Sequence, residues 1–142
     1  MDGEFDLQRF VTAQDGVMAN VRAELAAGHK RSHWMWFVFP QVAGLGFSAM
    51  AQRYAISSVA EARAYLAHPV LGPRLRECTE LVLGVEGRDA RAIFGSPDDL
   101  KFRSSMTLFA HEGAEPCRLA LDKFFAGESD VRTLSIVRNR DS

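Results

Sequence analysis

The stretch LGPRLRECTELVLGVEG, residues 71–87, decides the fold class of this 142-residue chain. Its apolar residues recur at alternating steps of four and three: Leu71, Leu75, Cys78, Val82 and Val85. This spacing places all five side chains on one face of an α-helix, whereas a half-buried strand needs an apolar residue at every second position. The stretch therefore predicts an amphipathic helix, which Gly87 ends.

Signals for helix starts and ends lie on the N-terminal side of this stretch. Asp15 and Gly28 lie at the two ends of a segment with the apolar spacing of a helix, where an N-cap and a C-terminal stop are expected. Asp6 precedes an earlier, shorter segment of the same kind. Ser58 and Glu61 have the spacing of a capping box. These signals predict three further helices before residue 71.

Similar signals follow on the C-terminal side. Asp89 can cap a short helix that ends at Gly95, and the segment 96–99 (Ser-Pro-Asp-Asp) combines a cap, a proline and acids at a helix start. Pro116 begins another helix that Gly127 ends, and Asp130 can cap a last one through Val137. The second half of the chain is therefore also expected to be helical.

No segment alternates cleanly between apolar and polar residues, and only Trp34–Phe39 has the composition of a strand. One lone strand makes no sheet. We therefore expect an all-α fold, a single multihelical domain of about seven to nine short helices. The domain is expected to span residues 1–137, with 138–142 as a frayed C-terminal tail.

Composition excludes several classes of function. The formal net charge of −1 argues against bulk nucleic-acid binding, which needs a basic surface. The N-terminus lacks the apolar segment of a signal peptide, and the longest apolar run, Trp34–Phe39, is too short to cross a bilayer. We expect a soluble cytoplasmic protein without membrane contact, in which Cys78 and Cys117 are buried, reduced thiols. Composition leaves the oligomeric state open.

The stretch KRSHWMWFVFPQ, residues 30–41, has two interpretations. As a core helix it supplies aromatic packing, with its cations in solvent. As a pocket wall it offers tryptophan faces for a nucleobase or sugar ring, beside cations that attract phosphate. We expect Trp36–Phe39 to be core and the polar entrance Lys30–Trp34 to open a pocket. The candidate ligand-binding residues here are Lys30, His33, Trp34 and Trp36.

The stretch LKFRSSMTLF, residues 100–109, would be packed on two faces of a helix, which brings Lys101 and Ser104 near a dry region. Lys101 either pairs with Asp98 three residues back or binds an anion. Arg103 is a further phosphate-binding candidate. A nucleophilic role for Ser104 beside Lys101 is only loosely indicated, because the order is not that of an SxxK motif.

Arg53 and Tyr54 complete the candidate ligand-binding residues, because they follow an apolar stretch and either can point inward. The preceding GLG, residues 44–46, is neither a dinucleotide-binding GxGxxG motif nor a P-loop. His29 and His33 have the spacing of zinc ligands on a helix, but Gly28 interrupts that helix and no HExxH glutamate follows. We expect no metal and no cofactor.

Several segments together resemble a known family: HWMWFVFPQ (33–41), GLG (44–46), ARAYLAHPVLGPRL (62–75), IFG (93–95) and DDLKFRSSMTLF (98–109). They are similar to domain-of-unknown-function family 1810, small bacterial proteins sometimes labelled calpastatin-like. The resemblance covers roughly residues 5–137, and it implies a mainly helical single domain in which 34–39 is helical. It implies no catalytic residues, and a flexible protease inhibitor would be more polar than this chain.

Asp89, Phe94 and Gly95 also resemble part of a helical superfamily associated with ADP-ribose derivatives, which includes an N-glycosidase of riboflavin-pathway intermediates. In this sequence Ile-Phe-Gly stands where that superfamily has tryptophan-glycine. The resemblance implies a ligand of the ADP-ribose type or an N-glycoside.

Two functions follow. The first is a pocket protein that binds or hydrolyses a phosphorylated nucleotide-like small molecule, with Glu77 and Glu80 as the nominated carboxylates for hydrolysis. The alternative is a non-enzymatic interaction module that binds a protein in a helical groove. A structure that gathers His33, Arg53 and Lys101 in one concave site favours the first function, and a structure that scatters them favours the second.

Overall fold

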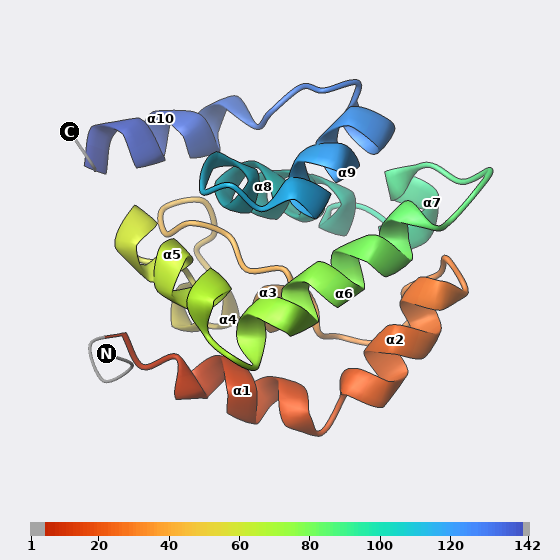
Figure 1. Ribbon diagram of the computed structural model, residues 1–142, viewed down its shortest axis with the longest axis horizontal. Helices are drawn as coiled ribbons and strands as arrows, with labels where there is room; N and C mark the ends of the chain where they lie inside the picture. Colours follow the sequence, from red (N-terminus) through yellow and green to blue (C-terminus); the bar gives the residue numbers. More distant parts are fainter. Residues whose placement is uncertain (1–4, 141–142) are drawn as a thin grey trace.

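The computed structural model describes residues 5–140, which form helices joined by loops (Figure 1). Within these residues the helices are α1 Gln8–Asp15, α2 Met18–Ala26, α3 Met35–Val38, α4 Ala49–Arg53, α5 Val59–Ala67, α6 Leu71–Leu83, α7 Ala90–Phe94, α8 Asp98–His111, α9 Glu115–Phe125 and α10 Val131–Arg140. The β-pairing in this span is an isolated parallel bridge between Val42 and Ile56. The predicted all-α class is confirmed, and the described residues form ten helices where seven to nine were expected, with α3, α4 and α7 only four or five residues long.

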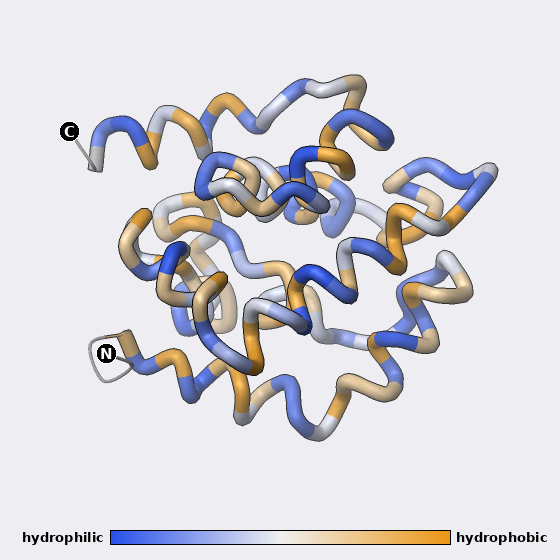
Figure 2. The backbone as a smooth tube through the Cα atoms, viewed as in Figure 1, coloured by the Kyte–Doolittle hydropathy of each residue, from blue (hydrophilic) through white to orange (hydrophobic). Residues whose placement is uncertain are grey.

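Helix α6 crosses the molecule between the α1–α2 pair and the α8–α9 pair (Figure 1). All five apolar residues of its predicted face are buried, and orange and blue stretches alternate along it in Figure 2. The helix ends at Leu83, earlier than predicted, and Val85 is buried just beyond its end. Gly87 lies in the following turn with φ +75°, a conformation that suits glycine.

The capping predictions succeed where the side chain reaches its amide. The Ser58 hydroxyl accepts from the Glu61 amide at 3.1 Å, and the Asp89 carboxylate accepts from the Ala92 amide at 2.8 Å. Asp130 accepts from the Thr133 amide at 3.0 Å. The predicted caps at Asp6, Asp15 and Ser96 are wrong: α1, α2 and α8 begin at Gln8, Met18 and Asp98 without a side-chain cap.

Aromatic side chains from distant segments form the core. Phe94 stacks on Phe102 with 4.5 Å between ring centroids, and Phe39 meets Phe102 edge-on at 5.0 Å. Phe10 of α1 meets Tyr65 of α5 in the same edge-on way at 5.1 Å. Such pairs contribute about 0.5–1.5 kcal/mol each beyond their buried area, so these contacts help to fix how α7 and the end of α3 pack on α8 and how α1 packs on α5.

Helix α10 packs against α8 and continues to Arg140. Residues 138–140, predicted as part of a frayed tail, are therefore helical, and 141–142 lie outside the described residues. None of the helices in the described part of the chain is long and apolar enough to cross a membrane.

Candidate functional site

A groove of about 450 Å³ lies where α8 and α10 begin and where the loop after α3 passes them. This volume is within the roughly 300–1,000 Å³ of small-molecule sites. We call it the groove; its lining residues are Gln41, Leu45, Gly46, Pro97, Leu100, Lys101, Arg103, Ser104, Asp130 and Arg132. It therefore gathers Lys101, Arg103 and Ser104 of the predicted site, together with residues from two other segments.

Lys101 brings positive charge to the groove that its partner does not fully balance. Its ammonium lies 3.5 Å from Oδ1 of Asp98, while the Lys30 ammonium lies 2.9 Å from Oδ2 of the same carboxylate. One carboxylate thus faces two ammonium groups. The predicted pairing of Lys101 with Asp98 is present, and it leaves one positive charge in excess at the wall of the groove.

Arg103 holds the segment before α10 in place. Its guanidinium donates to the carbonyl oxygens of Glu128 at 2.9 Å and Ser129 at 3.2 Å. The Glu128 carboxylate, on a side chain that is 76% exposed, is 3.6 Å away. Arg103 therefore has a structural task, and its charge is only weakly balanced because exposed ion pairs are screened by solvent.

Arg132, in the first turn of α10, is exposed and forms no ion pair or hydrogen bond with residues 5–140. A cation at this end of a helix is disfavoured by the helix dipole. Its position is therefore a cost to the fold, and an anionic ligand in the groove would offset that cost.

Ser104 lines the groove, and its hydrogen bonds are those of a structural residue. Its hydroxyl lies 3.1 Å from the Leu100 carbonyl oxygen and 3.2 Å from Oδ2 of Asp130. The same Asp130 oxygen accepts from the amide and the hydroxyl of Thr133. The contacts of Ser104 thus tie α8 to the cap of α10 and include none with Lys101.

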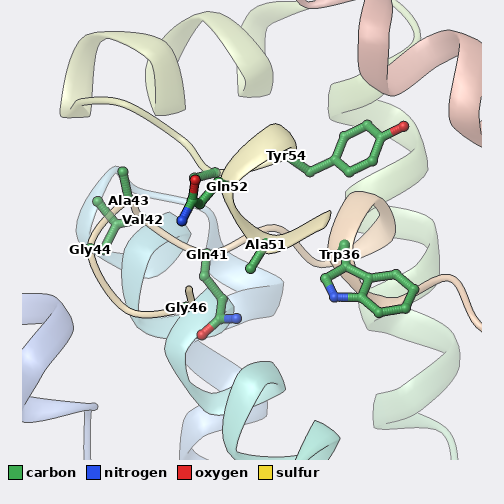
Figure 3. Close-up of a pocket in the computed structure, with 10 residues that line it drawn as sticks. Trp36, Gln41, Val42, Ala43, Gly44, Gly46, Ala51, Gln52 and Tyr54 are labelled. Atoms are coloured by element: carbon green, nitrogen blue, oxygen red, sulfur yellow. The ribbon is translucent and has the colours of Figure 1, made fainter. Parts of the chain in front are cut away.

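Beside the groove lies a smaller cavity of about 130 Å³ (Figure 3). We call it the cavity; its lining residues are Trp36, Gln41, Val42, Ala43, Gly44, Gly46, Ala51, Gln52, Tyr54 and Ala55. Two predicted site residues, Trp36 and Tyr54, belong to it. The Lys101 ammonium lies 5.5 Å from the centroid of the Trp36 ring, so a cation of the groove contacts the aromatic wall of the cavity.

The two tryptophans take roles opposite to those expected. Trp34 is 1% exposed, and its indole N–H donates to Oε1 of Glu24 at 2.9 Å. Trp36, expected to be core, is only partly buried and lines the cavity. The short helix α3 starts after Trp34, which turns Trp34 inward with Phe37 and leaves Trp36 on the other side.

Glu24 fixes the loop that leads to Trp34. Burial acts to raise the pKa of its carboxyl group, but hydrogen bonds from the Ser32 hydroxyl, the Arg31 and Ser32 amides and the Trp34 indole outweigh burial and lower the pKa from its ordinary 4.5 to about 2. The predicted polar entrance is therefore a loop held by one carboxylate. A hollow of about 190 Å³ beside it is lined by Glu24, His29 and Arg31, and not by the predicted residues Lys30, His33 and Trp34.

The remaining predicted residues do not join the groove or the cavity. Lys30 has a side chain only 8% exposed, held by Asp98 and by the Ser32 carbonyl oxygen at 2.7 Å. His33 is exposed, and Arg53 lies at the surface with its guanidinium 5.5 Å from the Tyr54 ring centroid. His33, Arg53 and Lys101 thus fail to converge, which by itself favours the interaction-module alternative.

The nominated carboxylates lie elsewhere. Glu77 on α6 pairs with Arg22 at 3.0 Å, and Glu77 and Glu80 are both exposed outside the groove and the cavity. His29 and His33 lie in the loop after α2, so they do not share a helix face. Among the described residues, no three His, Cys, Asp or Glu side chains are grouped closely enough to hold a metal ion.

Sequence reasoning missed Gln41, Asp130 as a groove residue, and Arg132. Asp130 was recognised only as a cap. Arg132 carries a signal that was available, since a cation within two residues of a helix cap opposes the helix dipole. Gln41 carries little local signal, because nothing in its neighbourhood distinguishes it from an ordinary loop residue after Pro40.

Comparison with known proteins supports the fold and the family. The family model described as "Protein of unknown function (DUF1810)" matches residues 4–137. Among solved structures, the chain is similar to the conserved hypothetical protein Rv1873 from Mycobacterium tuberculosis, with 55% identity and a TM-score of 0.93 over 95% of this chain and 98% of that one. No match is found among curated proteins.

Proposed function

The chain belongs to the DUF1810 family of proteins of unknown function, and we propose from the geometry of the groove that it binds a phosphorylated, nucleotide-like small molecule. The observation that carries the proposal is the convergence of Lys101, Arg103 and Arg132 on one concave surface of a chain whose net charge is −1. Lysine and arginine are the residues that proteins use to hold phosphate.

The apolar part of the groove supports a ligand with more than a phosphate. Leu45, Pro97 and Leu100 line it beside the cations, and Leu100 is 57% exposed. A mixed wall of this kind is typical of sites in which a few charged groups orient a largely apolar or ring-bearing ligand.

The proposal concerns binding and not hydrolysis of an N-glycosidic bond. Asp130 is the one carboxylate among the described residues that line the groove, and it is engaged as the cap of α10. The contacts at its Oδ2, from Ser104 and Thr133, give this carboxylate a structural role. Glu77 and Glu80 lie outside the groove, so neither is proposed as catalytic.

Thermal unfolding in the presence of ligands tests the proposal. ADP, ADP-ribose and NAD at millimolar concentration should raise the melting temperature by several degrees, because a ligand that binds only the folded state stabilises it. Adenosine without phosphate should have a much smaller effect. If none of the phosphorylated compounds raises the melting temperature, the proposal is wrong.

An interaction module remains the second candidate, and one observation favours it. Of the four large apolar side chains that are exposed in residues 5–140, Leu100 lines the groove, while Phe47 and Val131 are next in sequence to the lining residues Gly46, Asp130 and Arg132. Apolar side chains at a groove are typical of protein-binding surfaces. Under this alternative, Phe47→Ser would abolish the interaction with a partner while nucleotides leave the melting temperature unchanged.

We also propose that the protein works in the cytoplasm. Cys78 and Cys117 are free and buried, and burial raises the pKa of each thiol to about 12. Thiols of this kind stay protonated and unreactive at neutral pH, which suits a protein that needs no disulfide for stability. Recovery of the protein outside the cytoplasm in cell fractionation would contradict this placement.

A further inference from the structure

The groove and the cavity share a wall. Gln41 and Gly46 line both of them, and the segment between these residues separates the two spaces. The wall is tightly packed at Gly46, where an added Cβ would lie 2.7 Å from the Cβ of Ala51. Because the two spaces share this wall, a ligand that lies across it would contact both the groove and the cavity.

The side-chain amide of Gln41 lies at this boundary. Its backbone is fixed, because its carbonyl oxygen accepts from the Ile56 amide at 2.8 Å and the Ala43 amide donates to the Ile56 carbonyl oxygen at 2.8 Å. Its half-buried side chain forms no hydrogen bond in the described part of the chain. The side-chain amide, with two donors and one acceptor, is therefore open to a ligand that enters either space.

Two other polar side chains of the cavity differ in whether they already form a hydrogen bond within the protein. Gln52 already donates its Nε2 to the Phe47 carbonyl oxygen at 2.9 Å. The Trp36 indole N–H, by contrast, has no hydrogen-bond partner among residues 5–140, and Figure 3 shows its nitrogen on the side of the ring toward Ala51 and Gln41. Gln41 and Trp36 thus supply the cavity with polar groups that form no hydrogen bond to residues 5–140 and that a ligand can reach.

We infer that the cavity holds the base of a purine nucleoside phosphate whose phosphate lies in the groove, and that Gln41 hydrogen-bonds to the edge of that base. This rests on the proposed function, since the groove must bind phosphate for the ligand to be placed. A glutamine amide matches the adjacent donor and acceptor of adenine, and the flat face of Trp36 suits a base ring.

The experiment is calorimetric titration of the full chain with three probes: ADP, ribose 5-phosphate and inorganic pyrophosphate. The proteins are the wild type, Gln41→Ala and a control, Gln8→Ala, which removes an exposed glutamine of α1 that bonds to Thr12. Wild type should bind ADP at least tenfold more tightly than the other two probes. Gln41→Ala should weaken ADP binding about five- to a hundredfold and leave pyrophosphate binding unchanged, while Gln8→Ala changes neither.

The other outcomes separate the inference from the proposed function. If all three probes bind equally and Gln41→Ala alters none, the groove binds phosphate and the inference about the base is overturned. If Gln41→Ala weakens ADP and pyrophosphate to the same extent, Gln41 serves the phosphate and the inference is again overturned. If wild type binds no probe, the proposed function and the inference both fall.

Discussion

The ammonium of Lys101 lies 5.5 Å from the centroid of the Trp36 ring, which joins a cation of the groove to the aromatic wall of the cavity. The two residues are 65 positions apart, and they meet because α3 and α8 share the aromatic core around Phe39 and Phe102. The core packing thus places a phosphate-binding type of side chain beside a ring-stacking one.

Lys101→Ala should abolish ligand binding and leave stability within about 0.5 kcal/mol of wild type. The reason is that Asp98 keeps its 2.9 Å ion pair with Lys30. Lys30→Ala should instead lower the free energy of unfolding by about 2 kcal/mol or more, because it removes a nearly buried charge with two partners. Urea unfolding and titration with ADP measure the two effects. Equal destabilisation by both substitutions would show that Lys101 is structural.

The two tryptophans should separate stability from binding. Trp34→Phe should cost about 2–4 kcal/mol, since it leaves a gap in the core and removes a donor from Glu24. Trp36→Ala should cost less and should weaken ADP binding at least tenfold. His33→Ala should change neither quantity, because His33 lines neither the groove nor the cavity. A binding loss in the folded Trp34→Phe protein that matches the loss in Trp36→Ala would contradict this assignment.

Local patterns predicted the helices well, because a face such as Leu71–Val85 and a cap such as Ser58 depend on residues within a few positions of each other. They predicted part of the groove for the same reason: Lys101, Arg103 and Ser104 lie on one helix.

What local patterns could not predict was how distant segments meet. Arg132 joins the groove because α10 packs on α8, and Trp34 is buried in the core with its indole N–H donating to Glu24, ten residues earlier. Gln41 lines both the groove and the cavity because its loop passes between them.

The stabilising effect of Glu24 should disappear in acid. Its pKa is about 2 in the folded state and near 4.5 in the unfolded chain, so its contribution is complete above pH 4.5 and falls as the pH drops toward 2. Solvent screening limits the contribution to about 1–2 kcal/mol at pH 7. Glu24→Gln should therefore lower the free energy of unfolding more at pH 7 than at pH 3, as measured by urea unfolding. A difference in the free energy of unfolding between Glu24→Gln and wild type that is the same at both pH values would refute this role.

Gly46→Ala should weaken ligand binding because its Cβ would meet Ala51 and displace the wall between groove and cavity. We expect a loss of about 1–3 kcal/mol in stability, as for other overpacked sites, and at least tenfold weaker binding of ADP. Gly16→Ala is the matched control, because nothing lies within 4 Å of the added Cβ and its φ is −81°. Normal ADP affinity in the folded Gly46→Ala protein would argue that the shared wall does not shape the site.

The most direct test of the groove is calorimetric titration of ADP into wild type, Arg132→Ala and Arg138→Ala. Both arginines are exposed on α10, and only Arg132 lines the groove. We predict that wild type and Arg138→Ala bind ADP equally and that Arg132→Ala binds it about ten- to a hundredfold more weakly while being at least as stable as wild type. Equal ADP affinities in all three proteins, or no binding by wild type, would contradict the account.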